Sequence, residues 1–479
     1  MGYLERLDSY KEEMLATLGD SIAIDSVETE PVKSSTGELM PFGKGIRDAL
    51  LHILSVGEEM GFDTYNCDNY GGYIEYKAPR NGSEKPEQLG ISGHIDVMPA
   101  GTGWTGDPFD MVEKDGFVYG RGVSDDKGPV FASLYAMKAL KDEGIEPKMD
   151  IRLIIGCDEE TNKAGMEYYL EKCGQPDMGF TPDGMFPLVN GEMGILIFDL
   201  AQKLGKDIGG DKLRMTKFES GTAPNAVPRE ARAVLMGTEE QYEEVKEIIE
   251  KYVAETGYNV KARKQGSALA IEAEGLAAHG AHPDLGLNPI TILMELFGRV
   301  EFGSDELNDF IRAYNEHIGF DFHGERIGCA FEDKQSGKLI FNVGMANINE
   351  ELANLTINIR YPVTCTDNQV FEGIEKALSD TKVGILKNMV EGPIYLPTDD
   401  PMVEKMMAAY REETGDKKSG PIVEAGGTYA KIINKTLAFG ALFPGEEDTM
   451  HQADEKMSIE SYYKMARIYA KALYYICCE

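Results

Sequence analysis

Apolar positions in the N-terminal part of the chain alternate between the spacing of helices and that of strands. Helical spacing marks three amphipathic segments, residues 4–24, 46–60 and 130–140. Short apolar runs typical of buried strands occupy residues 73–76, 88–97 and 151–155. Strands that alternate with helices predict an α/β fold with a mixed, largely parallel sheet flanked by helices.

The pattern changes after residue 187 and returns near residue 387. The middle region combines strand-like and helical segments, at 195–201, 239–255, 268–273, 288–300 and 352–361, with a polar glycine-rich loop at 203–211. The C-terminal region resumes the first style, with helices at 401–413 and 458–476 and a strand at 437–443. We therefore expect a discontinuous domain of residues 1–187 and 387–479, interrupted by an inserted α+β domain of residues 188–386.

Composition and charge narrow the classes of protein and partner. The 479 residues are 42% hydrophobic and 27% charged, as in ordinary globular proteins. No apolar run is long enough to cross a membrane, and the N-terminus lacks a hydrophobic signal segment. A net charge of −34 argues against nucleic acid and anionic membranes as partners. Seven dispersed cysteines without a Cys-x-x-Cys pair favour reduced thiols and a cytoplasmic location.

The segment 91–99 is the first candidate for chemistry. It is an apolar strand that carries His94 and Asp96 at its C-terminal end. Side chains at positions i and i+2 of a strand lie on the same face. Open α/β sheets build their sites at the carboxyl ends of their strands, which makes this pair a candidate site.

Further polar clusters follow other predicted strands, at residues 119–128, 158–160, 181–184 and 449–452. Each cluster alone has an ordinary structural explanation, such as a helix cap or a solvated loop. Together they supply histidines and carboxylates, which are ligands of zinc and similar metals. Because unpaired buried carboxylates are costly, several of them near strand ends favour a shared cation.

These clusters resemble the signatures of one enzyme family. Gly-His-x-Asp-Val-x-Pro stands at 93–99, Gly-Arg-Gly-x-x-Asp-Asp-Lys-Gly at 120–128 and Glu-Glu at 159–160. The chain thus resembles, over nearly its whole length, the two-metal zinc exopeptidases and amidohydrolases, which include acetylornithine deacetylase, aminoacylase and glutamate carboxypeptidases. The segment 99–105, the segment around residues 443–453 and the overall length look most like the PepV-type dipeptidases.

The resemblance implies a ligand set for two divalent metals. His94 and Asp183 correspond to ligands of one metal, and Glu160 and His451 to ligands of the other. Asp125 corresponds to the bridging carboxylate, because it directly precedes the x-Lys-Gly of its motif, whereas Asp126 does not. A cis peptide bond after Asp125 is expected from the same resemblance. Zinc is the first choice of metal, with manganese or cobalt as alternatives that suit the same ligands.

The resemblance also implies catalytic roles. Asp96 is expected to orient His94 through its second ring nitrogen. Glu159 is expected to be the general base, which takes a proton from a water bridging the metals and passes it to the leaving nitrogen.

The inserted domain, expected to act as a lid, matches the family at candidate substrate contacts. His279 corresponds to the histidine that stabilises the oxyanion, whereas His282 is an extra residue interpreted as structural. Asn225 corresponds to a second polar contact. Arg360, helped by the turn at Gly427 and Thr428, corresponds to the clamp on the substrate's carboxylate. Closure of the lid is expected to bring these groups over the metals.

Asp183 and Arg360 together imply a substrate class. In the resembling family an aspartate at the first position accompanies substrates with a free amino terminus, and the arginine suits a free carboxylate. We therefore expect a metal-dependent hydrolase of dipeptides or short peptides, as a monomer or homodimer. The alternatives are an N-acyl-amino-acid amidohydrolase of the same family and a catalytically silent peptide- or metal-binding protein. Glu159 argues against the silent protein, because binding alone needs no base beside the ligands.

Overall fold

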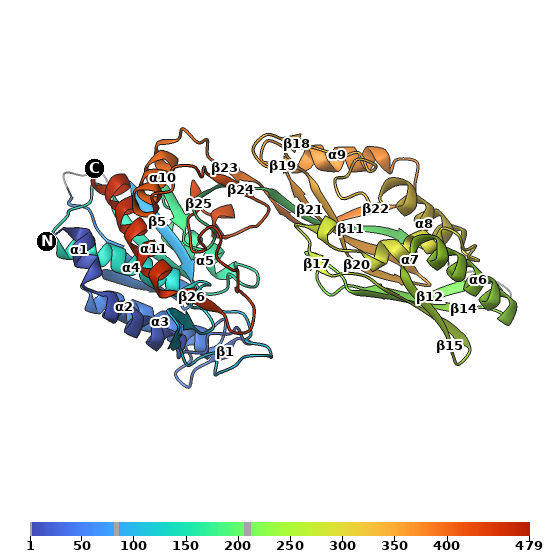
Figure 1. The fold of residues 1–479 in the computed structure, drawn as a ribbon, viewed down its shortest axis with the longest axis horizontal. Helices are drawn as coiled ribbons and strands as arrows, with labels where there is room; N and C mark the ends of the chain where they lie inside the picture. The colour runs from blue at the N-terminus through green and yellow to red at the C-terminus, as the bar shows by residue number, and fades with distance from the viewer. Residues whose placement is uncertain (1, 81–85, 206–211) are drawn as a thin grey trace. The chain divides into compact units, whose positions relative to one another are not determined.

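The computed structural model describes residues 2–80, 86–205 and 212–479. The chain forms two compact units, each built of helices on a sheet (Figure 1). Unit 1 consists of Met1–Gly191, Tyr395–Val423 and Gly427–Glu479. Unit 2 consists of Glu192–Ile394 and Glu424–Gly426. Part of the glycine-rich loop expected at 203–211 lies outside the described residues.

The main sheet of unit 1 is parallel at its centre and antiparallel at its edges. Its strands are β3 (Asp63–Cys67), β4 (Gly71–Tyr76), β5 (Gln88–His94), β8 (Asp150–Gly156), β9 (Met178–Thr181), β10 (Val189–Glu192), β23 (Ile394–Tyr395), β24 (Ile422–Glu424) and β25 (Thr436–Ala438). The order is β23-β10-β25-β9-β5-β8-β4-β3, with β24 on β10. β5 lies between β8 and β9 and is parallel to both. The mixed, partly parallel sheet confirms the predicted fold class.

Helices cover this sheet on two sides. They are α1 (Tyr3–Asp8), α2 (Lys11–Ile22), α3 (Lys44–Glu59), α4 (Lys127–Asp142), α5 (Ala164–Cys173), α10 (Pro401–Thr414) and α11 (Ile459–Leu473), the last continued by a π-helical turn Tyr474–Cys478. All but α5 contribute to one large hydrophobic core. A smaller core joins Met166 and Tyr169 of α5 to Ile154 and Tyr429. The sheet is therefore the middle layer of three.

Close packing between β5 and α4 positions the strand end that carries His94. Every residue of β5 is buried. A Cβ at Gly93 would lie 2.3 Å from Val130 Cγ2 and 2.5 Å from Asp126 Oδ2. Glycine is therefore required here for the start of α4 to approach the strand.

The strand expected at 88–97 ends at His94, so Asp96 lies in the loop beyond β5 and not on the strand. Two other elements of unit 1 also differ from the sequence prediction. The single helix expected at 4–24 is α1 and α2, because the chain leaves helical geometry at Tyr10, where φ is −96° and ψ is 1°. The strand expected at 437–443 ends at Ala438, because Gly440 turns the chain with a φ of 88°. Neither break leaves a mark in the apolar pattern.

Two small sheets complete the described strands of unit 1, and another small sheet lies in a loop region of unit 2. They are β1 (Val32–Lys33) with β2 (Leu39–Met40), β6 (Val112–Lys114) and β7 (Phe117–Tyr119) with β26 (Lys456–Ser458), and β18 (Glu332–Asp333) with β19 (Gly337–Lys338).

Unit 2 is an antiparallel sheet with helices on one face (Figure 1). The sheet order is β15 (Asn259–Gln265), β16 (Ala268–Glu274), β14 (Glu230–Met236), β12 (Arg214–Ser220), β20 (Ile340–Asn349), β21 (Leu352–Tyr361), β11 (Gly194–Lys203) and β22 (Gly384–Glu391). The helices are α6 (Glu239–Thr256), α7 (Pro289–Phe297), α8 (Asp305–His317) and α9 (Asp367–Ala377), and β13 (Ala226–Val227) pairs with β17 (Ala278–His279). In the described part of the chain, no helix combines the length and apolar character that crossing a membrane requires.

Candidate metal centre and substrate contacts

His94 ends β5 and is fully buried. Its Nδ1 lies 3.0 Å from the main-chain oxygen of Asp96 and 3.4 Å from that residue's Oδ1. The other carboxylate oxygen of Asp96 accepts a hydrogen bond of 3.1 Å from the backbone N–H of Glu160. Asp96 therefore touches both the histidine and the loop that follows β8, although the closest acceptor for His94 is the carbonyl and not the expected carboxylate.

Asp125 lies just before α4 and faces two histidines. Its Oδ1 is 3.1 Å from His94 Nε2, and its Oδ2 is 2.8 Å from His451 Nε2. The neighbouring Asp126 instead accepts a hydrogen bond from the backbone N–H of His94. The peptide bond between Asp125 and Asp126 is cis, which confirms that expectation.

The described residues contain two groups of side chains with the spacing of metal ligands. His94, Glu159 and Asp183 form one group, and Asp125, Glu160 and His451 form the other. Within each group the ligand atoms lie within 4.8 Å of one another. The structure thus brings together all five residues expected as ligands and the expected base Glu159, from segments spread over most of unit 1.

Carboxylates crowd the first group. Burial raises the pKa of Glu159 to about 8, an increase that Lys163 opposes and Asp183 reinforces. Burial and the charge of Asp125 raise the pKa of Asp183 to about 7. Without a cation these acids hold protons that their ordinary pKa values would release at neutral pH.

Neighbouring carboxylates raise the pKa values of both histidines. Hydrogen bonds to Asp125 and Glu160 raise the pKa of His451 to about 10. Burial alone would lower the pKa of His94, but the charges of Asp96 and Asp125 outweigh it and hold that pKa well above the usual value. The Oε1 of Glu160 is buried and has no hydrogen-bond partner among the residues that the structure describes. Divalent cations would satisfy these groups together, so the donor set fits two metal ions of the zinc, manganese or cobalt type.

The ammonium group of Lys163, from the same loop, forms an ion pair with Glu159. Lys163 Nζ lies 3.2 Å from Glu159 Oε1 and donates a 3.2 Å hydrogen bond to the carbonyl of Gly427. Thr428 Oγ1 accepts from the N–H of Ala430, as the cap of a short 3₁₀ turn. Gly427 and Thr428, expected as substrate contacts, therefore lie beside the candidate base, joined to it by Lys163.

A cavity of about 530 Å³ adjoins the second ligand group. Asp96 and Glu160 line it together with Phe42, and Glu28 and Glu30 add further negative charge. No basic side chain is among its lining residues. This cavity gives unit 1 space for a ligand next to the candidate metal ligands.

His279 and Asn225 lie side by side in unit 2. β13 and β17 pair Ala226 with His279, and the carbonyl of Asn225 accepts a 2.7 Å hydrogen bond from the N–H of Gly280. Both side chains are exposed. The Nδ1 of His279 accepts from the N–H of Ala281 at 3.2 Å, so the neutral ring carries its proton on Nε2. Partial desolvation of the exposed ring and the charge of Arg360 lower the pKa of His279, which favours this neutral donor form.

Arg360 lies on β21 and is 6% exposed. Its Nε has no hydrogen-bond partner in the described part of the chain, and burial lowers the pKa of Arg360 to about 10. Burying an arginine with an unsatisfied N–H donor costs free energy unless a carboxylate accepts a hydrogen bond from that donor. The charge of this guanidinium acts on His279, so the candidate substrate contacts of unit 2 occupy one neighbourhood.

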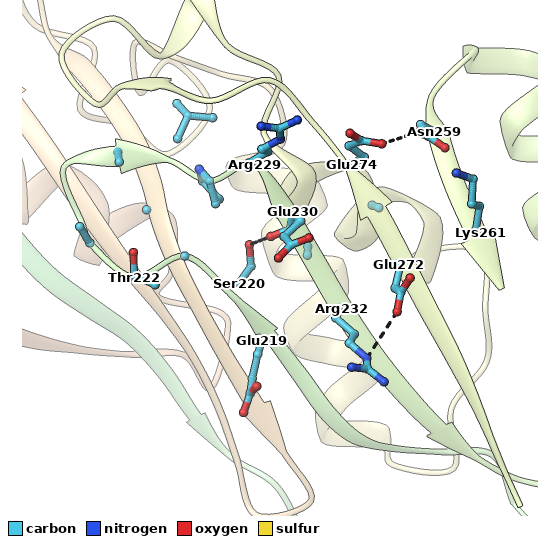
Figure 2. A pocket seen from close by; sticks show the side chains of 18 residues that line it. Glu219, Ser220, Thr222, Arg229, Glu230, Arg232, Asn259, Lys261, Glu272 and Glu274 are labelled. Carbon is cyan, nitrogen blue, oxygen red and sulfur yellow. Dashed lines mark hydrogen bonds and ion pairs between the residues drawn. The ribbon is translucent and has the colours of Figure 1, made fainter. Parts of the chain in front are cut away.

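Unit 2 also has a pocket on its sheet, with a volume of about 800 Å³ (Figure 2). Two polar pairs lie on it: Arg232 Nε is 3.7 Å from Glu272, and Asn259 donates a hydrogen bond to Glu274. None of the residues expected in the site lines it. We interpret it as a solvated face of the sheet.

Sequence reasoning missed two polar residues beside the ligands. Lys163 contacts Glu159, and Glu455 contacts the loop of Asp125. Lys163 stands four positions after Glu159, a spacing common to many solvated ion pairs. Glu455 stands in a polar segment shortly after His451, and no pattern in that segment indicates burial.

Comparisons with known proteins identify the family and the fold of the chain. Residues 90–475 match the family model "Peptidase family M20/M25/M40". The chain is 35% identical over 480 residues to the Beta-Ala-Xaa dipeptidase of Lactobacillus delbrueckii subsp. lactis, covering 99% of this chain and 98% of that protein. Human carnosine dipeptidase 1 has a similar fold, with a TM-score of 0.54 at 16% identity over 99% of this chain and 98% of the other. Aminopeptidase PepT from Bacillus cereus gives a TM-score of 0.55 at 13% identity, over 97% and 98%.

Proposed function

The chain belongs to peptidase family M20/M25/M40, hydrolases that act on peptide bonds, and we propose that it is a dinuclear metallo-dipeptidase. Its substrates are dipeptides or short peptides with a free N-terminus. The observation that carries the proposal is the position of Asp125, whose two oxygens face His94 and His451. The similar Beta-Ala-Xaa dipeptidase supports the substrate class.

In this proposal His94 and Asp183 hold one metal, Glu160 and His451 hold the other, and Asp125 is shared. Zinc is the proposed metal, because histidine and carboxylate ligands in a site open to substrate suit it. When bound, two such cations polarise the scissile carbonyl and lower the pKa of water.

Glu159 performs the proton transfers. Its carboxylate takes a proton from the attacking water and then delivers it to the leaving nitrogen, which needs a group with a pKa near the working pH. In the metal-free site burial raises the pKa of Glu159 to about 8, and bound cations would lower it toward neutrality. Lys163 holds the carboxylate in place without removing it from the ligand group. Proton transfer of this kind contributes about 10²–10⁴-fold to the rate.

Residues of unit 2 recognise the substrate. The Nε2–H of His279 donates to the oxygen that becomes negative as the carbonyl is attacked. Asn225 supplies a further polar contact. Arg360 binds the C-terminal carboxylate of the substrate, because its guanidinium pairs with a carboxylate through two parallel hydrogen bonds. The glycine turn at Gly427 and Thr428 offers backbone N–H groups to the same carboxylate.

We also propose a cytoplasmic location, which the seven free cysteines support.

The test compares an unblocked dipeptide with its N-acetyl form. Protein stripped by a chelator and reloaded with zinc, manganese or cobalt is assayed on both. We expect activity to disappear with the metals, to return on reloading and to favour the unblocked dipeptide. Preference for the acetylated substrate would replace the proposal by an amidohydrolase, and hydrolysis without metals would overturn it.

A further inference from the structure

The carboxylate of Glu455 is completely buried beneath the loop that precedes α4. Its Oε2 accepts from Arg121 Nη1 at 2.8 Å and from the N–H of Gly122 at 3.1 Å. Its Oε1 accepts from the N–H groups of Ser124 at 2.9 Å and Asp125 at 3.2 Å. Three backbone donors and one guanidinium therefore converge on one side chain.

The segment that carries Glu455 also carries His451. Immediately after Glu455, β26 pairs with β7 and places Lys456 opposite Tyr119. The carbonyl of Glu455 accepts a 3.1 Å hydrogen bond from the N–H of Gly120. Main chain and side chain of Glu455 thus fasten the segment of one metal ligand, His451, to the loop of another, Asp125.

Arg121 and Asp454 extend this fastening to a third segment. Arg121 is buried, lies over the ring of Trp104 at 5.3 Å and approaches the carbonyl of Pro99 at 3.5 Å. Asp454 accepts hydrogen bonds from Thr105, at 2.8 Å from its N–H and 2.7 Å from its Oγ1. The loop at 99–105 follows the strand of His94, so all three segments that meet at Asp125 are tied together here.

A carboxylate is the side chain that these donors require. Backbone N–H groups that point to one place favour an anion, and a carboxylate only accepts hydrogen bonds. A glutamine of the same size would turn its NH₂ group toward at least one N–H donor, which leaves that donor unsatisfied. Groups that orient metal ligands often change metal affinity when they are replaced.

We propose that Glu455 is a positioning residue of the metal centre. It acts through Asp125 and His451, which it holds facing each other so that they can share one of the two cations. This inference rests on the proposed function, because it assigns Glu455 to the same two-metal site.

The experiment measures zinc binding and turnover for Glu455→Gln. Calorimetry gives the affinity and stoichiometry of the metal-free protein, and steady-state kinetics at saturating zinc give kcat and KM on an unblocked dipeptide. Glu75→Gln is the matched control. Glu75 is 4% exposed and accepts from Arg152 at 2.9 and 2.7 Å, so it belongs to another buried glutamate–arginine pair of unit 1. Its side-chain hydrogen-bond donors among the described residues, Arg152 and Gln88, lie outside the metal-ligand loops.

We expect Glu455→Gln to bind at least one zinc about 10–100-fold more weakly. At saturating zinc, kcat should remain reduced while KM stays unchanged, because the substrate contacts are intact. Glu75→Gln should lower the melting temperature without changing zinc affinity. Equal zinc affinity and kcat in wild type and Glu455→Gln would overturn the inference. A wild type that binds no metal pair would instead refute the proposed function.

Arg121→Lys provides a second test if Glu455→Gln does not fold. Lysine keeps the positive charge but cannot contact Glu455 and Pro99 at once or stack on Trp104 in the same way. We expect a smaller weakening of zinc binding in the same direction. Wild-type zinc affinity in a folded Arg121→Lys protein would contradict the role of this fastening.

Discussion

Asp125 Oδ2 lies 2.8 Å from His451 Nε2, although the two residues are separated by most of the chain. The other oxygen of the same carboxylate lies 3.1 Å from His94. Within the described residues, Asp125 is thus the one side chain that forms ion-pair contacts with both histidines of the site. This relationship generates the most direct prediction about metal binding.

Asp125→Asn should abolish activity and weaken both metal sites. Asparagine keeps the shape but loses the negative charge and one acceptor, so neither cation retains its shared ligand. Metal content after dialysis and turnover of an unblocked dipeptide measure the two effects. Asp115→Asn is the control, since Asp115 is exposed in a turn with a φ of 52°, which asparagine tolerates. Two retained metals in Asp125→Asn would disprove its bridging role.

Glu159→Gln should keep both metals and lose turnover. The amide cannot accept the proton of the attacking water, and we expect kcat to fall by about 10²–10⁴-fold. Metal analysis and kinetics on the same preparation separate this outcome from metal loss. If metal-loaded Glu159→Gln remained active, another group would have to be the base. If it lost a metal, Glu159 would be a ligand, as its position in the His94 and Asp183 group allows.

Arg360→Met should raise KM selectively for substrates with a free C-terminus. Hydrogen bonds to a charged group contribute about 1.5–3 kcal/mol, which corresponds to roughly 10–100-fold in affinity. A dipeptide and its C-terminal amide, assayed on wild type and variant, isolate the contact. The wild type should prefer the free acid, and the variant should not distinguish the two. A variant that still discriminates would remove Arg360 from carboxylate recognition.

From the environment of His52 we expect the protein to lose stability in acid, independently of the metals. Burial lowers the pKa of His52, and its buried Nε2 has no hydrogen-bond partner within residues 2–80, 86–205 and 212–479. The folded protein therefore binds fewer protons than the unfolded chain, whose histidine has a pKa of about 6.5. Neutral His52 contributes its full share to the free energy of unfolding above about pH 6.5. This contribution is lost as the pH falls from there through the lower pKa that His52 has in the folded protein.

Urea unfolding of metal-free wild type and His52→Gln, at a series of pH values between about 5 and 8, measures this contribution. The wild type should lose more stability than the variant below about pH 6.5. Parallel curves for the two proteins would show that His52 does not titrate differently in the folded state.

The apolar pattern predicted many elements of both units because most of the information that forms them is local. β21 has the bounds expected from its alternation, Leu352–Tyr361, and α6 begins at the expected Glu239 behind the Thr238 cap. The prediction of one helix at 4–24 was wrong, because the apolar periodicity continues through the turn at Ser9 and Tyr10 that separates α1 from α2.

For the site, the sequence by itself determined which chemical groups stand at strand ends, because a motif fixes residue types and their spacing along one segment. His94, Asp125, Glu159 and Glu160 were named in this way. Only the tertiary structure decided which atoms face one another, because distances between segments depend on strand order and loop packing. It placed Asp125 between two histidines and Lys163 against Glu159. It also buried Glu455 under the loop of Asp125, since the burial of a polar side chain depends on partners far away in the chain.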